Sequence, residues 1–410
     1  MSNQATAKTM KPKLRFPEFQ DADGWEETTL GAIARLRNGY AFKSSEYVDS
    51  GPFQIITIAN VQQGMLSLDA TKRIAELPSD IQAHQRLRID DTLISMTGNV
   101  GRVCRVTCEA LLLNQRVGKL IPEGVNPDFF YHLLQRDEFR NAMQMKAAGG
   151  AQGNLSSGDI NEYSLHCPAD SSEQRKIAEC LTSLDEVIAG HGQKLAALQS
   201  HKKGLLQQLF PSPGETRPRL RFPEFKKAPE WEEKNLSALA ENLDNRRIPV
   251  TESNRVKGEI PYYGASGIVD YINDHIFDEE LLCVSEDGAN LVARSTPIAF
   301  SISGKTWVNN HAHVLKFEHR ITQTLVENYL NSIPLDDFLT GMAQPKLNKA
   351  MLDSIPVCLP GIEEQQTIAE CLSSLDSVIA GEAQKLDALK THKHGLMQQL
   401  FPATAEAADL

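Results

Sequence analysis

The sequence predicts a mixed α/β fold, with two globular domains separated by two long antiparallel coiled-coil helices in a pseudo-twofold circular repeat. Three observations support this prediction. The hexapeptide Leu-Arg-Phe-Pro-Glu-Phe at 14–19 recurs at 220–225, and Trp25 recurs as Trp231 at the same offset of 206. Residues 173–211 recur at 364–402, with 28 of 39 positions identical. The interiors between these matched ends barely resemble each other, as is typical of divergent inserts in a duplicated frame.

Composition favours an ordinary globular protein. The 410 residues are enough for two separate hydrophobic cores, and the content of 41% hydrophobic and 23% charged residues is typical of soluble domains. No apolar run approaches the ~18 residues of a membrane-spanning helix, and no hydrophobic signal segment is apparent. The seven cysteines are odd in number and lie mostly in apolar runs. We therefore expect reduced thiols, a cytoplasmic location and no membrane contact.

The net charge of −11 argues against a free-standing, tight DNA-binding protein, because phosphate neutralisation dominates such affinity. The charge is uneven, since residues 1–165 hold 18 Lys and Arg against 19 Asp and Glu, and residues 213–363 hold 16 against 22. The first interior can present a local basic face. The second would need a basic partner to approach nucleic acid.

The repeated segment predicts a long helix with a heptad seam. Apolar residues keep 4-3 spacing at Ile177, Leu181, Leu184, Ile188, Leu195, Leu198, Leu205 and Leu209, and the second copy repeats the pattern. A proline precedes each helix (168 and 360), and another ends it (211 and 402). Glycines at 190, 192, 204, 381 and 395 are expected to weaken and bend the helices.

The junctions predict how the two helices are arranged. Leu-Phe-Pro at 209–211 is followed by a short linker and the hexapeptide at 220–225, and the two ends of the chain are the same junction cut open. A circular arrangement about a twofold axis makes the helices antiparallel and brings His191 close to Glu382. The alternative is two separate amphipathic packing helices.

Elements inside the inserts can also be predicted. Apolar, β-prone runs predict strands at 53–58, 92–96 and 111–120. One helix should begin near Asn126, with this side chain as cap and Pro127 in the first position, and another should begin near Ile321. The second interior is 15 residues shorter than the first, since 206 − 191 = 15, so their surfaces should differ.

Several motifs that suggest catalysis or metal binding are incomplete. Residues 303–306 (Ser-Gly-Lys-Thr) lack the first glycine of a phosphate-binding loop, where Ala299 stands. Asp128 replaces the second proline of an amino-methyltransferase motif. His311 and His313 would share one strand face without an evident third ligand, and Cys104 and Cys108 have no companion pair. We predict no catalytic, cofactor-binding or metal-binding residue.

The order of the repeats resembles the specificity subunit of type I restriction-modification systems. The resemblance rests on the Arg-Phe-Pro-Glu-Phe motif with a following Trp, and on helical repeats that end in Gln-Gln-Leu-Phe-Pro. It covers residues 14–402. Segments 91–95, 98–101 and 113–117 in the first interior are similar to target-recognition motifs of that family, as are 261–267, 286–288 and 309–313 in the second.

The resemblance implies a domain organisation and partners. Residues 1-165 would form target-recognition domain 1, 166-212 the first spacer helix, 213-355 target-recognition domain 2, and 356-410 the second spacer helix and a C-terminal tail. Each recognition domain would read one half of an asymmetric, bipartite double-stranded DNA target. The helices would space the domains and dock two methyltransferase subunits, to which restriction subunits are added. S-adenosylmethionine, ATP and Mg would be bound by those partners and not by this chain, which would be non-catalytic.

Candidate DNA contacts are the side chains that suit base edges and phosphates, Arg and Lys for guanine and Asn and Gln for adenine. The candidates are Asn38, Tyr40, Lys43, Asn99, Asn114, Gln115, Arg116, Gln152, Asn154, Arg246, Arg247, Tyr262, Tyr263, Ser266, Lys305, Asn309, Asn310 and Lys346. Residues 114–116 are equally consistent with a polar turn between strands. Residues 149–154 are also consistent with a plain linker, and the glycines near 264 with backbone geometry alone.

Two other functions stay open at this stage. A self-contained DNA-modifying enzyme is opposed by the missing cofactor and catalytic motifs. A coiled-coil scaffold without a nucleic-acid role would show no sequence-selective DNA binding even with methyltransferase subunits added.

Overall fold

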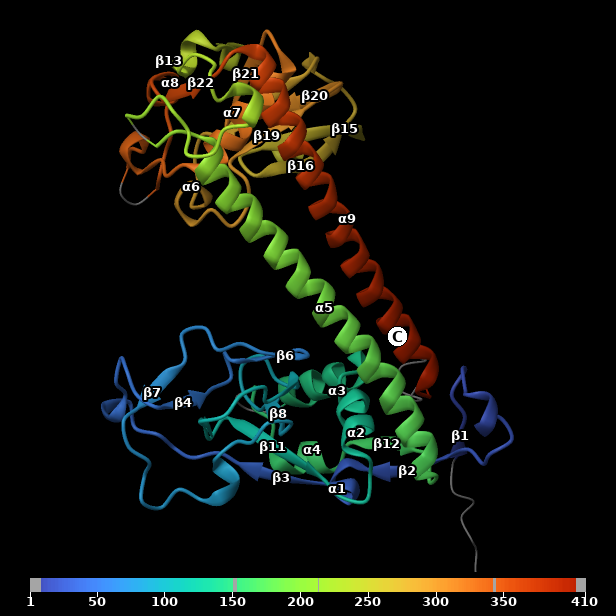
Figure 1. Cartoon of the computed structure of the whole chain (residues 1–410). Helices are drawn as coiled ribbons and strands as arrows, with labels where there is room; N and C mark the ends of the chain where they lie inside the picture. The colour runs from blue at the N-terminus through green and yellow to red at the C-terminus, as the bar shows by residue number, and fades with distance from the viewer. Residues whose placement is uncertain (1–8, 150–152, 213, 342–343, 403–410) are drawn as a thin grey trace, which may run out of the picture. The chain divides into compact units, whose positions relative to one another are not determined.

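The computed structural model describes residues 9–149, 153–212, 214–341 and 344–402 (Figure 1). The chain divides into two compact units. Unit 1 contains residues up to Gly190 and from Lys385 onward, and unit 2 contains His191–Gln384. Each unit therefore combines one insert with part of both long helices. The two ends of each long helix therefore belong to different units.

Among the described residues, unit 1 contains three sheets of three or four strands. The first is antiparallel, in the order β3 (Ala34–Asn38), β11 (Val117–Pro122), β8 (Thr92–Ser95) and β9 (Val103–Arg105). The second has the order β10 (Leu111–Leu113), β4 (Phe53–Ile56) and β7 (Lys72–Ile74), with β10 and β4 parallel. The third joins β1 (Thr9–Met10), β2 (Trp25–Thr29) and β12 (Ser164–Cys167). Strands β5 (Val61–Gln62) and β6 (Met65–Leu66) form a hairpin, and the helices are α1 (Leu30–Ile33), α2 (Pro127–Leu134), α3 (Asp137–Ala148) and α4 (Ser157–Asn161).

Unit 2 repeats this plan despite its different sequence. Its antiparallel sheet has the order β14 (Ala240–Asn242), β21 (Ala312–Phe317), β18 (Leu281–Ser285) and β19 (Ala299–Ile302). Its second sheet has the order β16 (Gly267–Ile272), β15 (Lys257–Gly264), β20 (Lys305–Val308) and β17 (Phe277–Asp278), with β15 and β20 parallel. Strands β13 (Glu232–Asn235) and β22 (Pro356–Leu359) pair separately, and the helices are α6 (Asn290–Ala293), α7 (Arg320–Ser332) and α8 (Lys349–Asp353).

Most predicted elements are confirmed, and one strand is corrected. Strands β4 and β8 match the first two predicted strands, although each is shorter. The predicted strand 111–120 is two strands, β10 and β11, in different sheets. The break occurs because Asn114 Oδ1 accepts a hydrogen bond from the Arg116 amide at 3.3 Å and turns the chain. Asn126 caps α2 as expected, accepting from the amides of residues 128 and 129.

The long helices are α5 (Ser171–Leu209) and α9 (Ile362–Leu400), and they pack antiparallel within each unit. In unit 1, Asp185 pairs with Lys393 at 2.6 Å. In unit 2, Lys202 pairs with Asp376 at 2.6 Å. In unit 1, residues early in α5 thus contact residues late in α9. In unit 2, residues late in α5 contact residues early in α9. The antiparallel prediction is confirmed, and both helices run through their glycines without a break in helical hydrogen bonding.

The circular junction is also confirmed. The Leu220 amide donates to the Gln208 carbonyl at 2.9 Å, and the Leu14 amide donates to the Gln399 carbonyl at the same distance. These donors and acceptors are repeat equivalents. The hexapeptide at 14–19 therefore hydrogen-bonds to the end of α9 in the same way as the hexapeptide at 220–225 hydrogen-bonds to the end of α5.

Each unit has its own core beneath the helix ends. In unit 1, Trp25 packs edge-on against Phe129 and Phe401, with ring centroids 5.7 and 5.9 Å away. In unit 2, Trp231 packs edge-on against Phe210 at 6.2 Å. Across the described residues, no helix is long and apolar enough to cross a membrane.

Candidate nucleic-acid interface

One end of the antiparallel sheet in unit 1 brings several loops together. The Met96 amide, just after β8, donates to the Arg116 carbonyl at 3.1 Å. The Leu155 amide donates to the Met96 carbonyl at 2.8 Å, and Thr97 forms a bridge with Asn154. Segments that are far apart in the sequence therefore lie edge to edge where β8 ends and β11 begins.

Unit 2 has the same hydrogen bonds at the same end of its sheet. The Glu286 amide, just after β18, donates to the His311 carbonyl at 2.9 Å. The Leu347 amide donates to the Glu286 carbonyl at 2.8 Å, and Asp287 forms a bridge with Lys346. We call these hydrogen bonds, with their unit 1 equivalents, the shared frame.

Two asparagines form equivalent turns in the shared frame. Asn309 Oδ1 accepts from the His311 amide at 2.8 Å, as Asn114 Oδ1 accepts from the Arg116 amide. Asn114 is 9% exposed and Asn309 is 7% exposed. Both side chains hydrogen-bond to the backbone of the turn, and the neighbouring side chains at 115, 116, 310 and 311 are exposed.

Exposed or half-exposed residues with polar side chains follow the shared frame in each unit, although the hydroxyl oxygen of Thr97 is itself buried. We define the rim of unit 1 as Thr97, Gln115, Arg116 and Asn154. We define the rim of unit 2 as their equivalents, Asp287, Asn310, His311 and Lys346. The predicted candidates at 115, 116, 154, 310 and 346 are thus brought together, within their own units.

Two other candidates in unit 1 lie beside this rim, since Asn38 pairs with Gly118 of β11 and the Asn99 carbonyl accepts from the Ser95 hydroxyl. Residues 38, 43 and 99 are exposed, and Tyr40 is half-buried. Tyr40 forms a parallel bridge with Asn114, and its hydroxyl donates to Asp80 at 2.8 Å, which raises the pKa of the tyrosine. Gly39 permits this bridge, because a side chain there would collide with the Asn114 carbonyl. Gln152 lies outside the described residues.

Several candidates in unit 2 have structural partners instead. Tyr262 is 1% exposed, and its hydroxyl bonds to the backbone of Val250. Tyr263 is half-buried and stacks on Phe300. Arg246 bonds to Glu279 at 2.9 Å and lies over the Phe277 ring. These side chains hold the fold together in the structure.

The remaining candidates of unit 2 differ in placement. Ser266 and Lys305 are exposed. The carbonyl of Ala265 accepts from the Ser285 hydroxyl at 2.5 Å, so the turn that carries Ser266 lies beside the shared frame. Arg247, in contrast, is mostly covered and bonds to Glu286 at 2.6 Å and to the Ala312 carbonyl at 2.8 Å.

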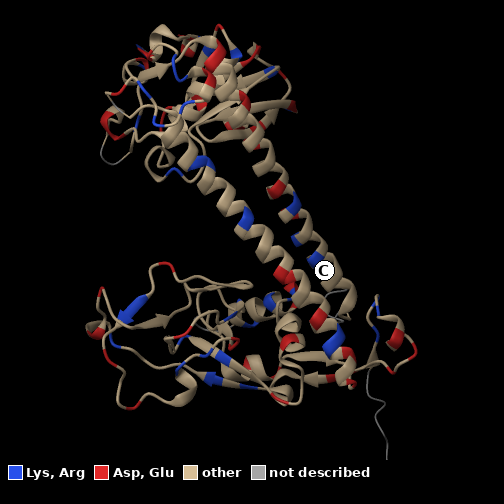
Figure 2. Ribbon diagram, viewed as in Figure 1, with Lys and Arg blue, Asp and Glu red and all other residues tan. Residues whose placement is uncertain are grey.

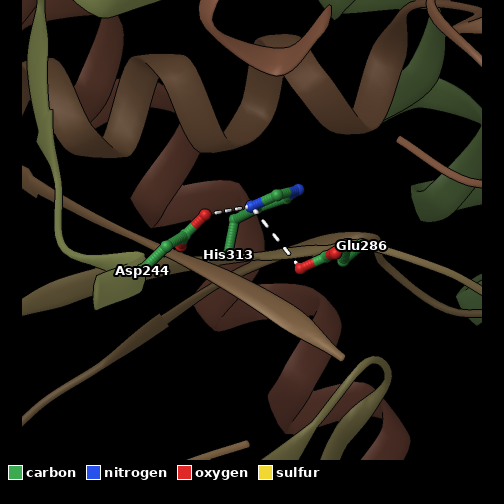
Figure 3. Close-up of side chains that lie close together, drawn as sticks. All are labelled: Asp244, Glu286 and His313. Carbon is green, nitrogen blue, oxygen red and sulfur yellow. Dashed lines mark hydrogen bonds and ion pairs between the residues drawn. The ribbon is translucent and has the colours of Figure 1, made fainter. Parts of the chain in front are cut away.

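A charged cluster lies directly under the rim of unit 2. Figure 3 shows His313 between Asp244 and Glu286, with its Nδ1 atom 2.6 Å from Asp244 Oδ2 and 3.8 Å from Glu286 Oε2. The sequence suggested no third ligand beside His313, whereas the fold supplies two carboxylates whose ligand atoms lie within 4.8 Å of it and of each other. Donor type alone would therefore permit a metal ion.

The partners of the cluster favour an ion network over a metal centre. Arg247 donates to Glu286 and lies 3.3 Å from Asp244, and Lys346 lies 3.1 Å from Glu286. The other ring nitrogen of His313 bonds to the Leu347 carbonyl at 2.7 Å. Both imidazole nitrogens are thus engaged, and two cations already neutralise the carboxylates.

The pKa shifts agree with this assignment. Burial raises the pKa of Glu286, but hydrogen bonds from Arg247 and Lys346 outweigh burial, so the pKa lies below its usual value. Burial likewise raises the pKa of Asp244, and the bonds from His313 and the Val314 amide outweigh it. Both carboxylates are therefore ionised at neutral pH, and the network ties the segments that carry residues 244, 286 and 346.

Unit 1 fills the equivalent space with apolar atoms. The strand registers pair Gly118 with Ile94 and His313 with Val284, which makes Gly118 the equivalent of His313. A side chain at Gly118 would meet Leu36, Ile94 and Met96. The two rims thus rest on different supports, one apolar and one ionic.

Charge is mixed in both units. Figure 2 shows blue and red segments interspersed in each unit and along α5 and α9. The rims differ more clearly, since Arg116 is the charged member of the unit 1 rim, whereas the unit 2 rim pairs the Asp287 carboxylate with the Nδ1 atom of His311 at 2.9 Å.

The list of candidate contacts omits three rim residues, Thr97, Asp287 and His311, although the segments 286–288 and 309–313 that resemble recognition motifs include the last two. A signal was present in the printed sequence. The same turn-forming asparagine starts both Asn114-Gln115-Arg116 and Asn309-Asn310-His311. Aligning these two segments would have identified His311 as the equivalent of Arg116. The equivalence of Thr97 and Asp287 needs the sheet register and has no comparable signal.

Two unlike α/β domains on a duplicated helical frame, each with polar side chains suited to base edges at one end of its sheet, define a modular recognition protein. The model of the type I restriction modification DNA specificity domain matches residues 22–200 and 229–391. The chain belongs to this family.

Relatives and a solved structure agree with this membership. The chain is 35% identical over 149 residues to a putative type I restriction enzyme specificity subunit of Haemophilus influenzae, a match that spans 36% of this chain but only 38% of that relative's length. It is 23% identical over 398 residues to the putative MjaX specificity subunit of Methanocaldococcus jannaschii, covering 92% and 93% of the two chains. The crystal structure of the type I system S subunit from M. genitalium has the same fold, with a TM-score of 0.63 at 15% identity, covering 97% of this chain and 100% of that one.

Proposed function

We propose that this chain is the sequence-specific DNA-recognition subunit of a type I restriction-modification complex. Each unit reads one half of an asymmetric, bipartite target in double-stranded DNA. The observation that carries the proposal is the shared frame, which presents different exposed side chains in the two units of one chain. Two different half-sites would follow from two different rims.

The chain contributes recognition, and its partners contribute catalysis. Methyltransferase subunits would supply S-adenosylmethionine chemistry, and restriction subunits would supply ATP- and Mg-dependent cleavage. These partners would also supply the basic surface that a chain of net charge −11 needs for tight DNA binding. Such a complex works beside DNA, so we infer a cytoplasmic location.

Methylome sequencing tests the recognition role. Deleting this chain from its host should remove methylation at one bipartite motif, and restoring the chain should restore it. The purified chain alone should transfer no methyl groups, whereas the chain with its methyltransferase partners should do so. Methyl transfer by the chain alone would instead favour a self-contained enzyme. Retention of every methylated motif after deletion would overturn the role.

Equivalent exposed residues on the long helices support two docking surfaces. Val187 is 44% exposed on α5, and its repeat equivalent Val378 is 49% exposed on α9. Equivalent positions of a twofold repeat can make equivalent contacts with two copies of one partner. We infer that each copy docks one methyltransferase subunit.

Charge substitution should disrupt docking one subunit at a time. Val187→Asp and Val378→Asp should each lower the number of bound methyltransferase subunits from two to one, because each buries a carboxylate in one apolar contact. The double variant should bind none. Mass measurement of the purified complex would show this, with the exposed Gln193→Asp as control. Two bound subunits in the double variant would place docking elsewhere.

A further inference from the structure

We propose that the two units contact DNA bases through equivalent positions of the shared frame, and that their rims select different kinds of base. The unit 1 rim selects guanine through Arg116. The unit 2 rim selects a base with an exocyclic amino group, cytosine or adenine, through Asp287. This inference rests on the proposed function and identifies the residues that distinguish the two half-sites.

The equivalence of the rims follows from backbone contacts. The two interiors share little sequence, yet they share two backbone hydrogen bonds. The bonds from amide 96 to carbonyl 116 and from amide 155 to carbonyl 96 in unit 1 recur in unit 2 as the bonds from amide 286 to carbonyl 311 and from amide 347 to carbonyl 286. The bridge 97–154 recurs as 287–346. Serines also recur at the strand ends, where the Ser95 hydroxyl donates to the Asn99 carbonyl and the Ser285 hydroxyl donates to the Ala265 carbonyl. Both units therefore hold their rim side chains at the same places on the sheet.

The side chains at these places differ in hydrogen-bonding character. A frame that is constant while its exposed side chains vary is the arrangement expected of domains that recognise different ligands. The alternative, that these positions vary because nothing constrains them, does not explain why all four unit 2 equivalents of the unit 1 rim residues are also polar. The pairs Thr97–Asp287 and Asn154–Lys346 differ in their donors and acceptors, which is the distinction that base edges make.

The unit 1 rim is dominated by a donor. Arg116 is exposed, and among the residues that the structure describes its guanidinium has no hydrogen-bond or ion-pair partner. A guanidinium offers five N–H donors and no acceptor, and it matches the O6 and N7 acceptors of guanine in the major groove. The other rim members, Thr97, Gln115 and Asn154, are uncharged, so no carboxylate opposes this contact.

The unit 2 rim contains an acceptor. Asp287 is equivalent to Thr97, and its side chain is 34% exposed. Its carboxylate accepts from His311 Nδ1 at 2.9 Å, which leaves further lone pairs for another donor. In the major groove those donors are the N4 amino group of cytosine and the N6 amino group of adenine. A carboxylate repels the acceptors of guanine and thymine, so Asp287 selects against them.

The ionic cluster under the unit 2 rim holds this acceptor in place. Glu286 precedes Asp287, and it bonds to Arg247 and lies 3.1 Å from Lys346. His313 bonds to the carbonyl of Leu347, the residue after Lys346. The cluster thus fixes both segments that the bridge 287–346 joins.

The test is methylome sequencing of cells that carry the variant chain with its methyltransferase partners. Arg116→Ala should change only one half of the bipartite motif and lower methylation of the native site by roughly tenfold or more, the size expected for one guanine contact. Asp287→Asn should change only the other half. Since an amide offers both a donor and an acceptor, the selected cytosine or adenine position should then also admit guanine or thymine.

Matched controls separate the rim from the rest of each unit. Arg88→Ala, before the start of β8, and Asp278→Asn on β17 remove exposed charges away from the rims and should leave both half-sites unchanged. Thermal unfolding of each purified variant should match that of the native chain, because all four side chains are exposed or half-exposed. If cells with each of the two rim variants still methylate an unchanged native DNA motif, the rim assignment is overturned and the proposed function is left intact. Changes in both halves from a single rim variant would also overturn it. A native chain whose removal alters no motif would overturn the proposed function itself.

Discussion

Replacing Glu173 by alanine is expected to lower the free energy of unfolding of unit 1 by about 3–5 kcal/mol, the cost of leaving a buried charge without its partner. Glu173 is 1% exposed at the start of α5. Its two carboxylate oxygens accept from Arg15 Nε and Nη2 at 2.7 Å each, and one of them also accepts from Trp25 Nε1 at 3.2 Å. The same guanidinium donates to the Ala22 carbonyl at 2.7 Å, so one residue connects the helix to the N-terminal hexapeptide.

The second repeat offers a matched comparison. Glu364 accepts from Arg221 at 2.8 and 2.7 Å in unit 2, but the Trp231 ring nitrogen has no hydrogen-bond partner among the described residues. Glu364→Ala should therefore cost unit 2 less than Glu173→Ala costs unit 1, because only the latter also leaves a tryptophan donor unsatisfied. Hydrogen exchange measured separately on α2 and α7 would assign each loss to its unit. A loss below 1 kcal/mol in unit 1 would contradict the prediction.

Acidification is expected to destabilise unit 1 through His132, by about 1.4 kcal/mol for each pH unit below the ordinary histidine pKa of about 6.5. His132 lies on α2 and is 1% exposed against α5, where its Nε2 atom is 3.1 Å from the Thr182 hydroxyl. Burial, helped by the charges of Lys393 and Arg105, lowers the pKa of His132 to about 3.

The sign follows from proton binding. Between pH 6.5 and about 3 the unfolded chain protonates this histidine and the folded chain does not, so folding loses stability as pH falls and regains it as pH rises. His132→Gln should flatten this part of the pH profile of unit 1 unfolding, whatever its effect at pH 7. His392→Gln, an exposed histidine on α9, should leave the slope unchanged. An unaltered slope in the His132 variant would show that other groups cause the acid sensitivity.

The helical frame was predictable because its signals are repetitive and local. Heptad spacing marks both helices, and the repeated junction fixes their direction, so the contact between His191 and Glu382 followed from counting residues. The split between β10 and β11 was not predictable from the apolar run alone, because it depends on one buried Asn114 side chain turning the chain between two sheets. Local propensity cannot distinguish one long strand from two short ones in such a run.

The candidate site was predictable only in part, for a physical reason. Residue type identified Arg116, Gln115 and Asn310, because these side chains suit base edges wherever they occur. The structure then showed that these three side chains are exposed, whereas Tyr262 and Arg247 are covered and bond to residues from distant segments. The role of Asp287 depends on sheet register, which pairs it with Lys346, 59 residues further along the chain. No single-sequence pattern contains that information.

The central contact of the helical pair has a consequence for assembly. His191 Nδ1 lies 2.5 Å from Glu382 Oε1, and Lys194 lies 2.8 Å from the other oxygen. These hydrogen bonds, first that of Lys194 and then that of His191, lower the pKa of Glu382. Because His191 and Glu382 are repeat equivalents, homotypic association of two α9 helices in this register would set glutamate against glutamate. The sequence difference at this one position therefore discriminates against like-with-like oligomers and favours a heterotypic pair of α5 with α9.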